Sequence, residues 1–203
     1  MEEDIYKTIL KGNEPVLFKD RNSKFYGYAI PVKTEEQVQE AIQNLKQEHH
    51  KARHWCYAYQ LGKTYKHWRA NDDGEPSNSA GMPIYGQLQS FQVTNCLVVV
   101  VRYFGGTKLG VSGLINAYRT GAQMALEACT IVTKTINIDY EVSCEYADLN
   151  KVMRVIKERN LNVTNQVMEM RCAITISVRE KEAETIHTVF DGIYGVKIKE
   201  LED

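Results

Sequence analysis

The pattern of apolar and polar positions changes along the chain, and each change predicts a different element. The run Leu97–Val101 has five apolar residues without a polar break, which is typical of a strand buried on both faces of a sheet. From Ser112 to Cys129, apolar residues recur at helical spacing. Small residues four positions apart form a second stripe on this helix: Gly113, Ala117, Gly121 and Ala125. The pattern predicts a buried strand, a glycine-rich turn and a helix lying close to the sheet, with Ser112 as its N-cap.

Shorter patterns precede this unit. Alternation predicts strands at three segments: 14–19, 24–32 and 53–60. A capping box at Thr34 begins a helix that extends to about His49, and residues 82–91 form another helix. Residues 61–78 are predicted to be loop. In the strand 53–60, one face carries Trp55, Tyr57 and Tyr59, and the other carries His54, Cys56 and Ala58.

The last third of the chain follows a new pattern. Residues 136–145 alternate between apolar and polar without exception, which is typical of a half-buried strand. The following segments indicate helix, strand, strand, helix and strand: 149–156, 161–168, 170–178, 183–190 and 194–199. The order βαββαβ fits a ferredoxin-like module. We therefore predict an α+β protein of two domains, 1–134 and 135–203.

Composition is ordinary for a globular protein of 203 residues, with 43% hydrophobic and 25% charged residues. The formal net charge of −1 gives no global field for nucleic acid or membrane. The balance is uneven, because residues 137–203 carry 9 Lys and Arg against 13 Asp and Glu, while the first 136 carry 16 against 13. The five cysteines show no CxxC spacing, the N-terminus is acidic, and no apolar run approaches the ~20 residues that span a bilayer. These features predict a cytoplasmic protein with reduced thiols and no membrane contact.

The glycine-rich turn is the first candidate site. Glycines permit positive φ, and a helix N-terminus offers free N–H groups and the positive end of a dipole, which together favour an anion or phosphate. The candidate ligands are Arg102, Tyr103, Gly105, Gly106, Lys108, Gly110 and Ser112. The motif is not a P-loop, because Val111 stands where lysine is needed, and the dinucleotide fingerprint is absent. The alternative is a tight turn that packs the helix onto the sheet.

A second candidate is the polar stretch at residues 71–83, where turn-forming residues predict a long loop. Its carboxylates are suited to a cation or a basic group, and the alternative is a solvated acidic loop. With the preceding strand it forms a polar cluster of five residues: His54, Asp72, Asp73, Glu75 and Ser77. Cys56 is interpreted as a core residue rather than a nucleophile. Neither a metal site nor a cofactor is predicted, because the histidines lack metal-ligand spacing on one element.

A third candidate is a stacking platform for single-stranded nucleic acid. It combines the aromatic face of the strand 53–60 with four basic residues: Arg53, Lys63, Lys66 and Arg69. The alternative is an aromatic face that packs under a helix. We favour the alternative, because a strand face of this kind is ordinary core.

Several spaced motifs resemble those of the YigZ/IMPACT family. They are RNSKFYGYA at 21–29, HHKARHWCYAY at 49–59, DDGEPSNSAGMP at 72–83 and NCLVVVVRYFGGTKLGVSGLINAY at 95–118. The resemblance covers the N-terminal two-thirds of the chain. It implies for the first domain the βαβ fold shared by GHMP kinases, the ribonuclease P protein and domain IV of elongation factor G. For the second domain it implies a likeness to the last domain of elongation factor G.

The resemblance also bears on function, since the eukaryotic IMPACT branch is linked to translational control through protein binding. We therefore expect a translation-linked regulator without catalysis that binds RNA, the ribosome or a protein partner. Two alternatives stay open: a small enzyme acting on a phosphorylated or nucleotide-like substrate at the glycine-rich turn, and an interaction module without a small ligand. The sequence departs from the family at Ser77-Asn78-Ser79 and Thr107-Lys108, which weakens the case for Lys108 as a ligand. The oligomeric state is not predicted.

Overall fold

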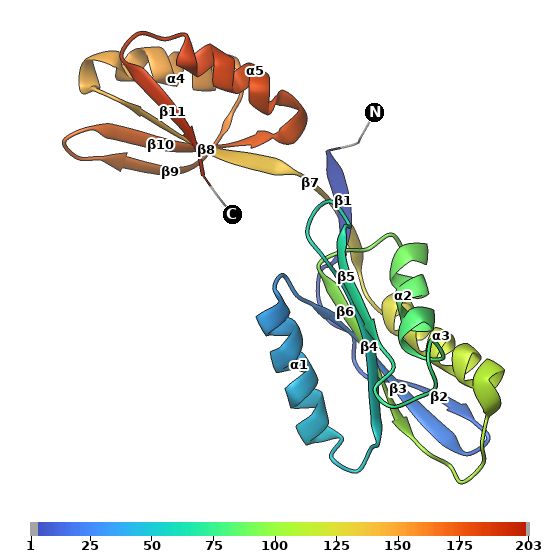
Figure 1. Ribbon diagram of the computed structural model, residues 1–203. Helices are drawn as coiled ribbons and strands as arrows, with labels where there is room; N and C mark the ends of the chain where they lie inside the picture. Colours follow the sequence, from blue (N-terminus) through green and yellow to red (C-terminus); the bar gives the residue numbers. More distant parts are fainter. Residues whose placement is uncertain (1–3, 202–203) are drawn as a thin grey trace. The chain divides into compact units, whose positions relative to one another are not determined.

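The computed structural model describes residues 4–201, which form two compact units (Figure 1). The first unit is Tyr6–Lys134. The second contains the residues from Thr135 onward together with Asp4 and Ile5. Each unit has its own apolar core, and the α+β class predicted from the sequence is confirmed.

The first unit is built on a five-stranded antiparallel sheet with strand order β2-β3-β6-β4-β5. Its strands are β2 (Val16–Asp20), β3 (Ser23–Pro31), β6 (Cys96–Tyr103), β4 (His54–Leu61) and β5 (His67–Asn71). The central strand β6 is buried from Cys96 to Arg102, as its unbroken apolar run predicts. The prediction of loop throughout 61–78 is wrong, because β5 lies within it. This edge strand, HWRAN, pairs through its backbone although it has no regular apolar alternation.

Helices cover both faces of this sheet. The helices α2 (Gly81–Ser90) and α3 (Gly110–Glu127) pack on one face, and α1 (Glu35–Glu48) packs on the other. The small-residue stripe of α3 allows close contact: a Cβ placed on Gly27 of β3 would lie 2.4 Å from the carbonyl oxygen of Gly121. The predicted N-cap is wrong, because α3 begins at Gly110 and Ser112 lies inside its first turn.

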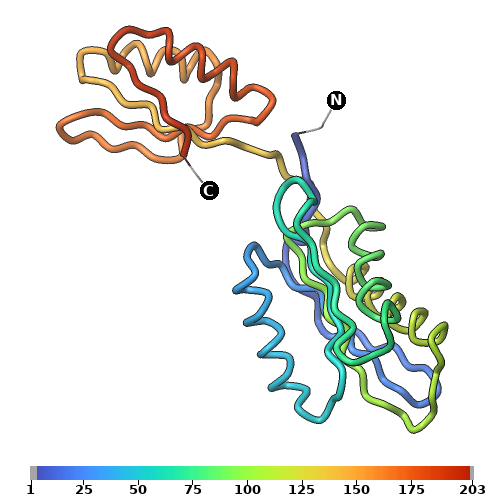
Figure 2. Tube along the Cα trace, in the orientation of Figure 1, coloured from blue at the N-terminus to red at the C-terminus, as the bar shows by residue number. Residues whose placement is uncertain are grey.

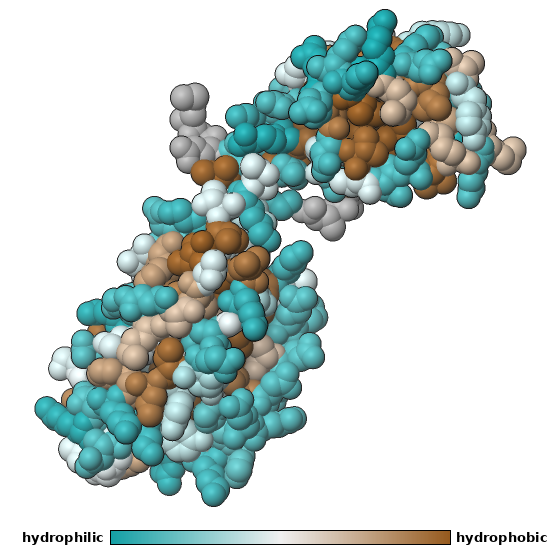
Figure 3. Space-filling view, turned by 180° about the vertical axis from the view of Figure 1, so that it is seen from behind, coloured by the Kyte–Doolittle hydropathy of each residue, from teal (hydrophilic) through white to brown (hydrophobic). Residues whose placement is uncertain are grey.

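The second unit has the predicted βαββαβ order. Its elements are β8 (Asn137–Cys144), α4 (Leu149–Glu158), β9 (Asn162–Met168), β10 (Cys172–Arg179), α5 (Glu180–Asp191) and β11 (Val196–Glu200), with a short 3-10 helix at Tyr146–Asp148. The antiparallel sheet has strand order β11-β8-β10-β9, and α4 and α5 bury their apolar faces with it. This is the ferredoxin-like arrangement. On the side shown in Figure 3, hydrophilic residues predominate and apolar residues gather in patches on each unit.

The pattern of residues 5–10 fits either a strand or an irregular segment, and the structure has a strand there, whereas the strand at residues 131–135 was not predicted. β1 (Ile5–Ile9) and β7 (Ile131–Thr135) pair in a two-stranded sheet, and Figure 2 shows these segments side by side. The chain passes from one unit to the other twice, once within each of these strands.

Candidate functional site

The acidic loop between β5 and α2 is held by its own carboxylates. Asp72 accepts hydrogen bonds from three backbone N–H groups: those of Asn78 at 2.8 Å, Ala80 at 3.0 Å and Gly81 at 2.8 Å. Since α2 begins at Gly81 and Ala80 supplies no side-chain cap, Asp72 takes the place of the missing N-cap side chain. Its charge therefore stabilises the start of a helix.

Asp73 fastens the same loop to β4. Its carboxylate accepts the N–H of Trp55 at 2.7 Å, and its carbonyl oxygen lies 2.9 Å from His54 Nδ1. A carbonyl oxygen only accepts hydrogen bonds, so Nδ1 of His54 is the donor in this contact. The bond fixes the imidazole ring in one orientation.

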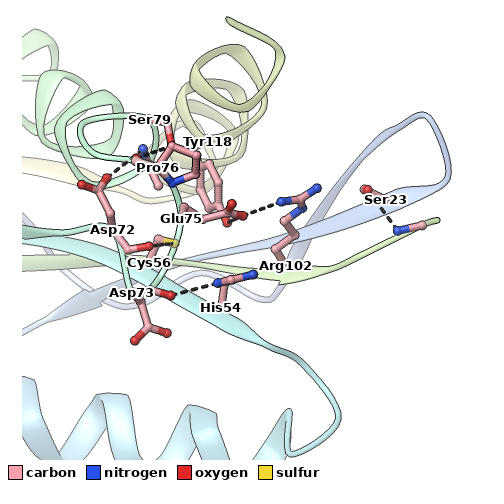
Figure 4. Close-up of polar contacts among 12 residues, drawn as sticks. Ser23, His54, Cys56, Asp72, Asp73, Glu75, Pro76, Ser79, Arg102 and Tyr118 are labelled. Carbon is pink, nitrogen blue, oxygen red and sulfur yellow. Dashed lines mark hydrogen bonds and ion pairs between the residues drawn. The ribbon is translucent and has the colours of Figure 1, made fainter. Parts of the chain in front are cut away.

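The third carboxylate, Glu75, joins the loop to the end of β6 (Figure 4). Arg102 Nη1 lies 2.6 Å from Glu75 Oε1, and the Tyr118 hydroxyl donates to the same oxygen at 2.8 Å. The Arg102 and Glu75 side chains are only 7% and 5% exposed. The guanidinium group also lies beside the rings of Phe25 and Phe104, at 5.6 Å and 5.5 Å from their centroids. Arg102 and Glu75 therefore form a buried ion pair, and the Tyr118 hydroxyl adds a hydrogen bond to its carboxylate.

Burial governs the ionisation of the neutral groups in this cluster. Desolvation, with the Glu75 carboxylate adding to it, raises the pKa of the Tyr118 hydroxyl far above its ordinary value. Desolvation likewise raises the pKa of the Cys56 thiol, whose Sγ donates to the Asp72 carbonyl oxygen at 3.0 Å. Cys56 is therefore a protonated thiol in the core, as the sequence interpretation has it, and lacks the thiolate that a nucleophile needs.

The side chains predicted as ligands at the glycine-rich turn do not lie together in the structure. Arg102 is buried and paired with Glu75, so its charge is not presented at the surface of the turn. Tyr103 points to the opposite face of the sheet, where its hydroxyl lies 2.9 Å from His49 Nδ1. Lys108 and Ser112 are exposed beside the start of α3.

Glycine is required in the turn for two different structural reasons, close packing and positive φ. Gly105 donates its N–H to Ser23 Oγ at 3.1 Å, and a Cβ on Gly105 would lie 2.1 Å from a backbone atom of Asn22. Gly106 and Gly110 have φ of +88° and +74° and open space around them. One glycine thus packs the turn against the β2–β3 hairpin, and the other two bend the chain into α3.

The predicted stacking platform is not a surface. Tyr57 and Tyr59 are buried with α1, which bears out the alternative interpretation of an aromatic face packed under a helix. Trp55 is half-buried, and Lys46 Nζ lies over its ring at 5.6 Å. The remaining predicted polar and basic residues lie outside the core: Ser77, Arg53, Lys66 and Arg69 are exposed, and Lys63 is half-buried.

Two members of the site escaped the sequence analysis. Tyr118 was counted in the apolar stripe of α3, and only its position opposite Glu75 reveals the hydroxyl as a donor. Ser23 begins β3 and lies within the motif RNSKFYGYA, but no pattern in the sequence indicates that its hydroxyl accepts the N–H of Gly105. Within residues 4–201, no group of three or more His, Cys, Asp or Glu side chains is placed to hold a metal ion. No helix in the same range is long and apolar enough to cross a membrane.

Comparisons with known proteins agree on one relationship. Residues 21–126 match the family described as the Impact N-terminal domain. The IMPACT family member YvyE of Bacillus subtilis (strain 168) is 35% identical over 153 residues, which are 75% of this chain and 70% of that protein. An IMPACT family member of Haemophilus influenzae is 31% identical over 173 residues, 83% of this chain and 84% of that protein.

Two solved structures complete the comparison. The crystal structure of a hypothetical protein matches with a TM-score of 0.71 and 25% identity, and the match covers 98% of each chain. The structure of the two-domain translational regulator Yih1 matches 58% of this chain and 45% of that chain, with 27% identity and a TM-score of 0.37.

Proposed function

The chain belongs to the IMPACT family, and we propose on that basis that it is a translation-linked regulator that acts by binding RNA or the ribosome. The link to translation comes from the family. The observation that favours a binding function over a catalytic one is the Arg102–Glu75–Tyr118 cluster. Four charged groups of the family motifs are bonded to one another or to backbone N–H groups: Asp72, Asp73, Glu75 and Arg102. They support a rigid scaffold and leave its exposed surface to recognise a partner.

Charge supports a polyanionic partner for the first unit. Tyr6–Lys134 contains 16 Lys and Arg against 10 Asp and Glu, a formal net charge of +6, whereas the whole chain has −1. The net charge of this unit is larger than that of residues 1–134, because the unit begins at Tyr6 and does not include the three acidic residues that precede Tyr6 in the sequence. A basic unit of this kind attracts RNA phosphates.

Co-sedimentation with purified ribosomes tests the proposal. We expect the full chain to sediment with ribosomes at low salt and to be released as salt rises, because bound phosphates release counterions. A plot of log affinity against log salt has a negative slope, and the variant Arg53→Ala/Lys66→Ala/Arg69→Ala should make that slope shallower by about 2. Its matched control is Lys157→Ala/Lys181→Ala/Lys197→Ala, which removes three exposed charges from the second unit.

The outcomes are distinct. Failure to sediment at low salt contradicts ribosome binding. Binding that resists salt and ribonuclease treatment assigns the partner to protein instead of RNA.

A second candidate function, anion binding by an enzyme acting on a phosphorylated substrate, is favoured by one observation. The helix α3 begins without a side-chain cap, beside exposed Lys108 and Ser112 and the positive-φ residues Gly106 and Gly110. Calorimetry with inorganic phosphate and nucleotides would detect such a site. Lys108→Ala should then weaken binding, and the exposed Arg119→Ala, on the same helix, should not.

A further inference from the structure

The sheet face that α1 covers continues beyond the end of that helix, and two tyrosines lie there on neighbouring strands. Tyr26 of β3 and Tyr103 of β6 have ring centroids 5.8 Å apart at an interplanar angle of 77°. Together with Asn22, Lys24 and Phe104 they line a hollow of about 430 Å³. That volume lies in the range typical of small-ligand sites, which is about 300–1,000 Å³.

The two tyrosine rings of this hollow are held in place by contacts with His49. The His49 ring lies 5.3 Å from the Tyr26 ring and 5.7 Å from the Tyr103 ring. Its Nδ1 also lies 2.9 Å from the Tyr103 hydroxyl, and its Nε2 lies 2.5 Å from the Tyr28 hydroxyl. Side chains fixed in this way lose little conformational entropy when a ligand binds.

The surroundings of the hollow are basic. Lys24 lines it, and Lys19 lies directly opposite Lys24 in the β2–β3 register, so both side chains leave the same face. Arg53 precedes His54, which pairs with Arg102, and this places Arg53 beside Tyr103 at the strand ends. Asp20 pairs with Ser23 and alternates onto the other face. Glu48, which lies 3.4 Å from the Tyr28 hydroxyl, is the carboxylate at this end of α1.

We propose that this hollow binds one unstacked base of single-stranded RNA. Tyr26, Tyr103 and Phe104 offer ring surfaces against which a base stacks, Asn22 offers an amide that both donates and accepts, and Lys24 contacts the adjoining phosphate. An acidic peptide would satisfy the lysines but would leave the aromatic hollow unfilled. The inference rests on the proposed function, since it names the part of the partner that the first unit recognises.

Fluorescence anisotropy with a labelled single-stranded oligoribonucleotide of about ten residues, long enough to cross one such groove, tests this on the full chain. Tyr26→Leu keeps an apolar side chain and removes the stacking ring, and it should weaken binding by about 5- to 100-fold. Lys24→Ala, at an exposed position, should make the negative slope of log affinity against log salt shallower by about 0.7. The matched controls Tyr194→Leu and Lys181→Ala change exposed residues of the second unit and should bind as wild type does. Thermal melts check that each variant is folded.

Several results would overturn the inference. One is a folded Tyr26→Leu variant, or a Lys24→Ala variant, that binds the oligonucleotide as wild type does. A second is duplex RNA bound as tightly as the single strand. A third is a mononucleotide bound as tightly as the oligonucleotide, which would make this a site for free nucleotides.

The ribosome experiment separates this inference from the proposed function. If wild type and Tyr26→Leu sediment equally with ribosomes and neither binds the oligonucleotide, the base site is wrong and ribosome binding stands. If wild type binds neither, both proposals fail. If Tyr26→Leu loses ribosome binding although wild type ignores free RNA, the hollow contacts protein and the RNA inference is overturned.

Discussion

Arg102 and Glu75 lie 27 positions apart in the sequence and form a buried ion pair that joins two of the family motifs. Removing one partner of a buried ion pair leaves the other charge desolvated and unpaired, which costs about 3–5 kcal/mol. We therefore expect Arg102→Ala to lower the free energy of unfolding by about that amount in urea titrations. The double variant Arg102→Met/Glu75→Leu should recover most of the loss, because it buries no uncompensated charge. A stable Arg102→Ala protein that has lost phosphate binding would instead make Arg102 a ligand.

His49 gives a prediction about pH. Burial lowers the pKa of His49 below its usual 6.5, and the attraction of the exposed Glu48 carboxylate opposes this shift without cancelling it. The folded state then binds fewer protons than the unfolded state, so the free energy of unfolding falls as pH drops through the ordinary histidine range. The loss between about pH 7.5 and about pH 5.5 should be larger in wild type than in His49→Gln. His50→Gln, at the exposed neighbouring position, should behave as wild type does. Equal losses in wild type and His49→Gln would contradict the assignment.

At the scale of elements, the glycines of the turn between β6 and α3 have different roles, and substitutions can distinguish them. A Cβ on Gly105 would overlap backbone atoms of the β2–β3 turn, which cannot turn away as the end of a flexible side chain can. We expect Gly105→Ala to destabilise the protein by about 3 kcal/mol. Gly106→Ala meets no neighbouring atom and strains only a positive φ, which costs about 1 kcal/mol. Thermal melts of both variants measure the difference, and equal effects would contradict this account.

The same elements show how far the sequence predicts the structure. The strand β6 and the helix α3 were predictable because an unbroken apolar run and a helical stripe are strong periodic signals. The edge strand β5 was missed because its stability comes from backbone pairing with β4, which periodicity does not record. Long-range pairing explains why β7 was missed as well, and why the pattern of residues 5–10 left a strand and an irregular segment open.

Part of the candidate site was also within reach of the sequence. Arg102 and Tyr103 are consecutive residues of one strand, so alternation alone places them on opposite faces and divides the predicted ligand set. By contrast, the sequence narrows the alternative partner of Arg102 only to Asp72, Asp73 or Glu75, because the choice depends on how the loop folds back over β6. The hollow beside Tyr26 depends on where α1 ends above the sheet.

At the scale of the whole molecule, Asp4 and Ile5 belong to the second unit although they precede the first unit in the sequence. The buried Asp4 carboxylate accepts two hydrogen bonds from Arg179, at 2.9 Å and 2.8 Å, and the Asp4 carbonyl oxygen accepts the N–H of Ile136 at 2.7 Å. Because Arg179 is 40% exposed, solvent screens the pair, and we expect Asp4→Ala to destabilise the second unit by about 1 kcal/mol. Calorimetry of the full chain should resolve two transitions, of which Asp4→Ala lowers one by a few degrees. The exposed Glu14→Ala, in the first unit, is the control and should shift neither transition. A single transition, or an equal shift of both, would show that the units unfold as one and would contradict the division at Tyr6 and Lys134.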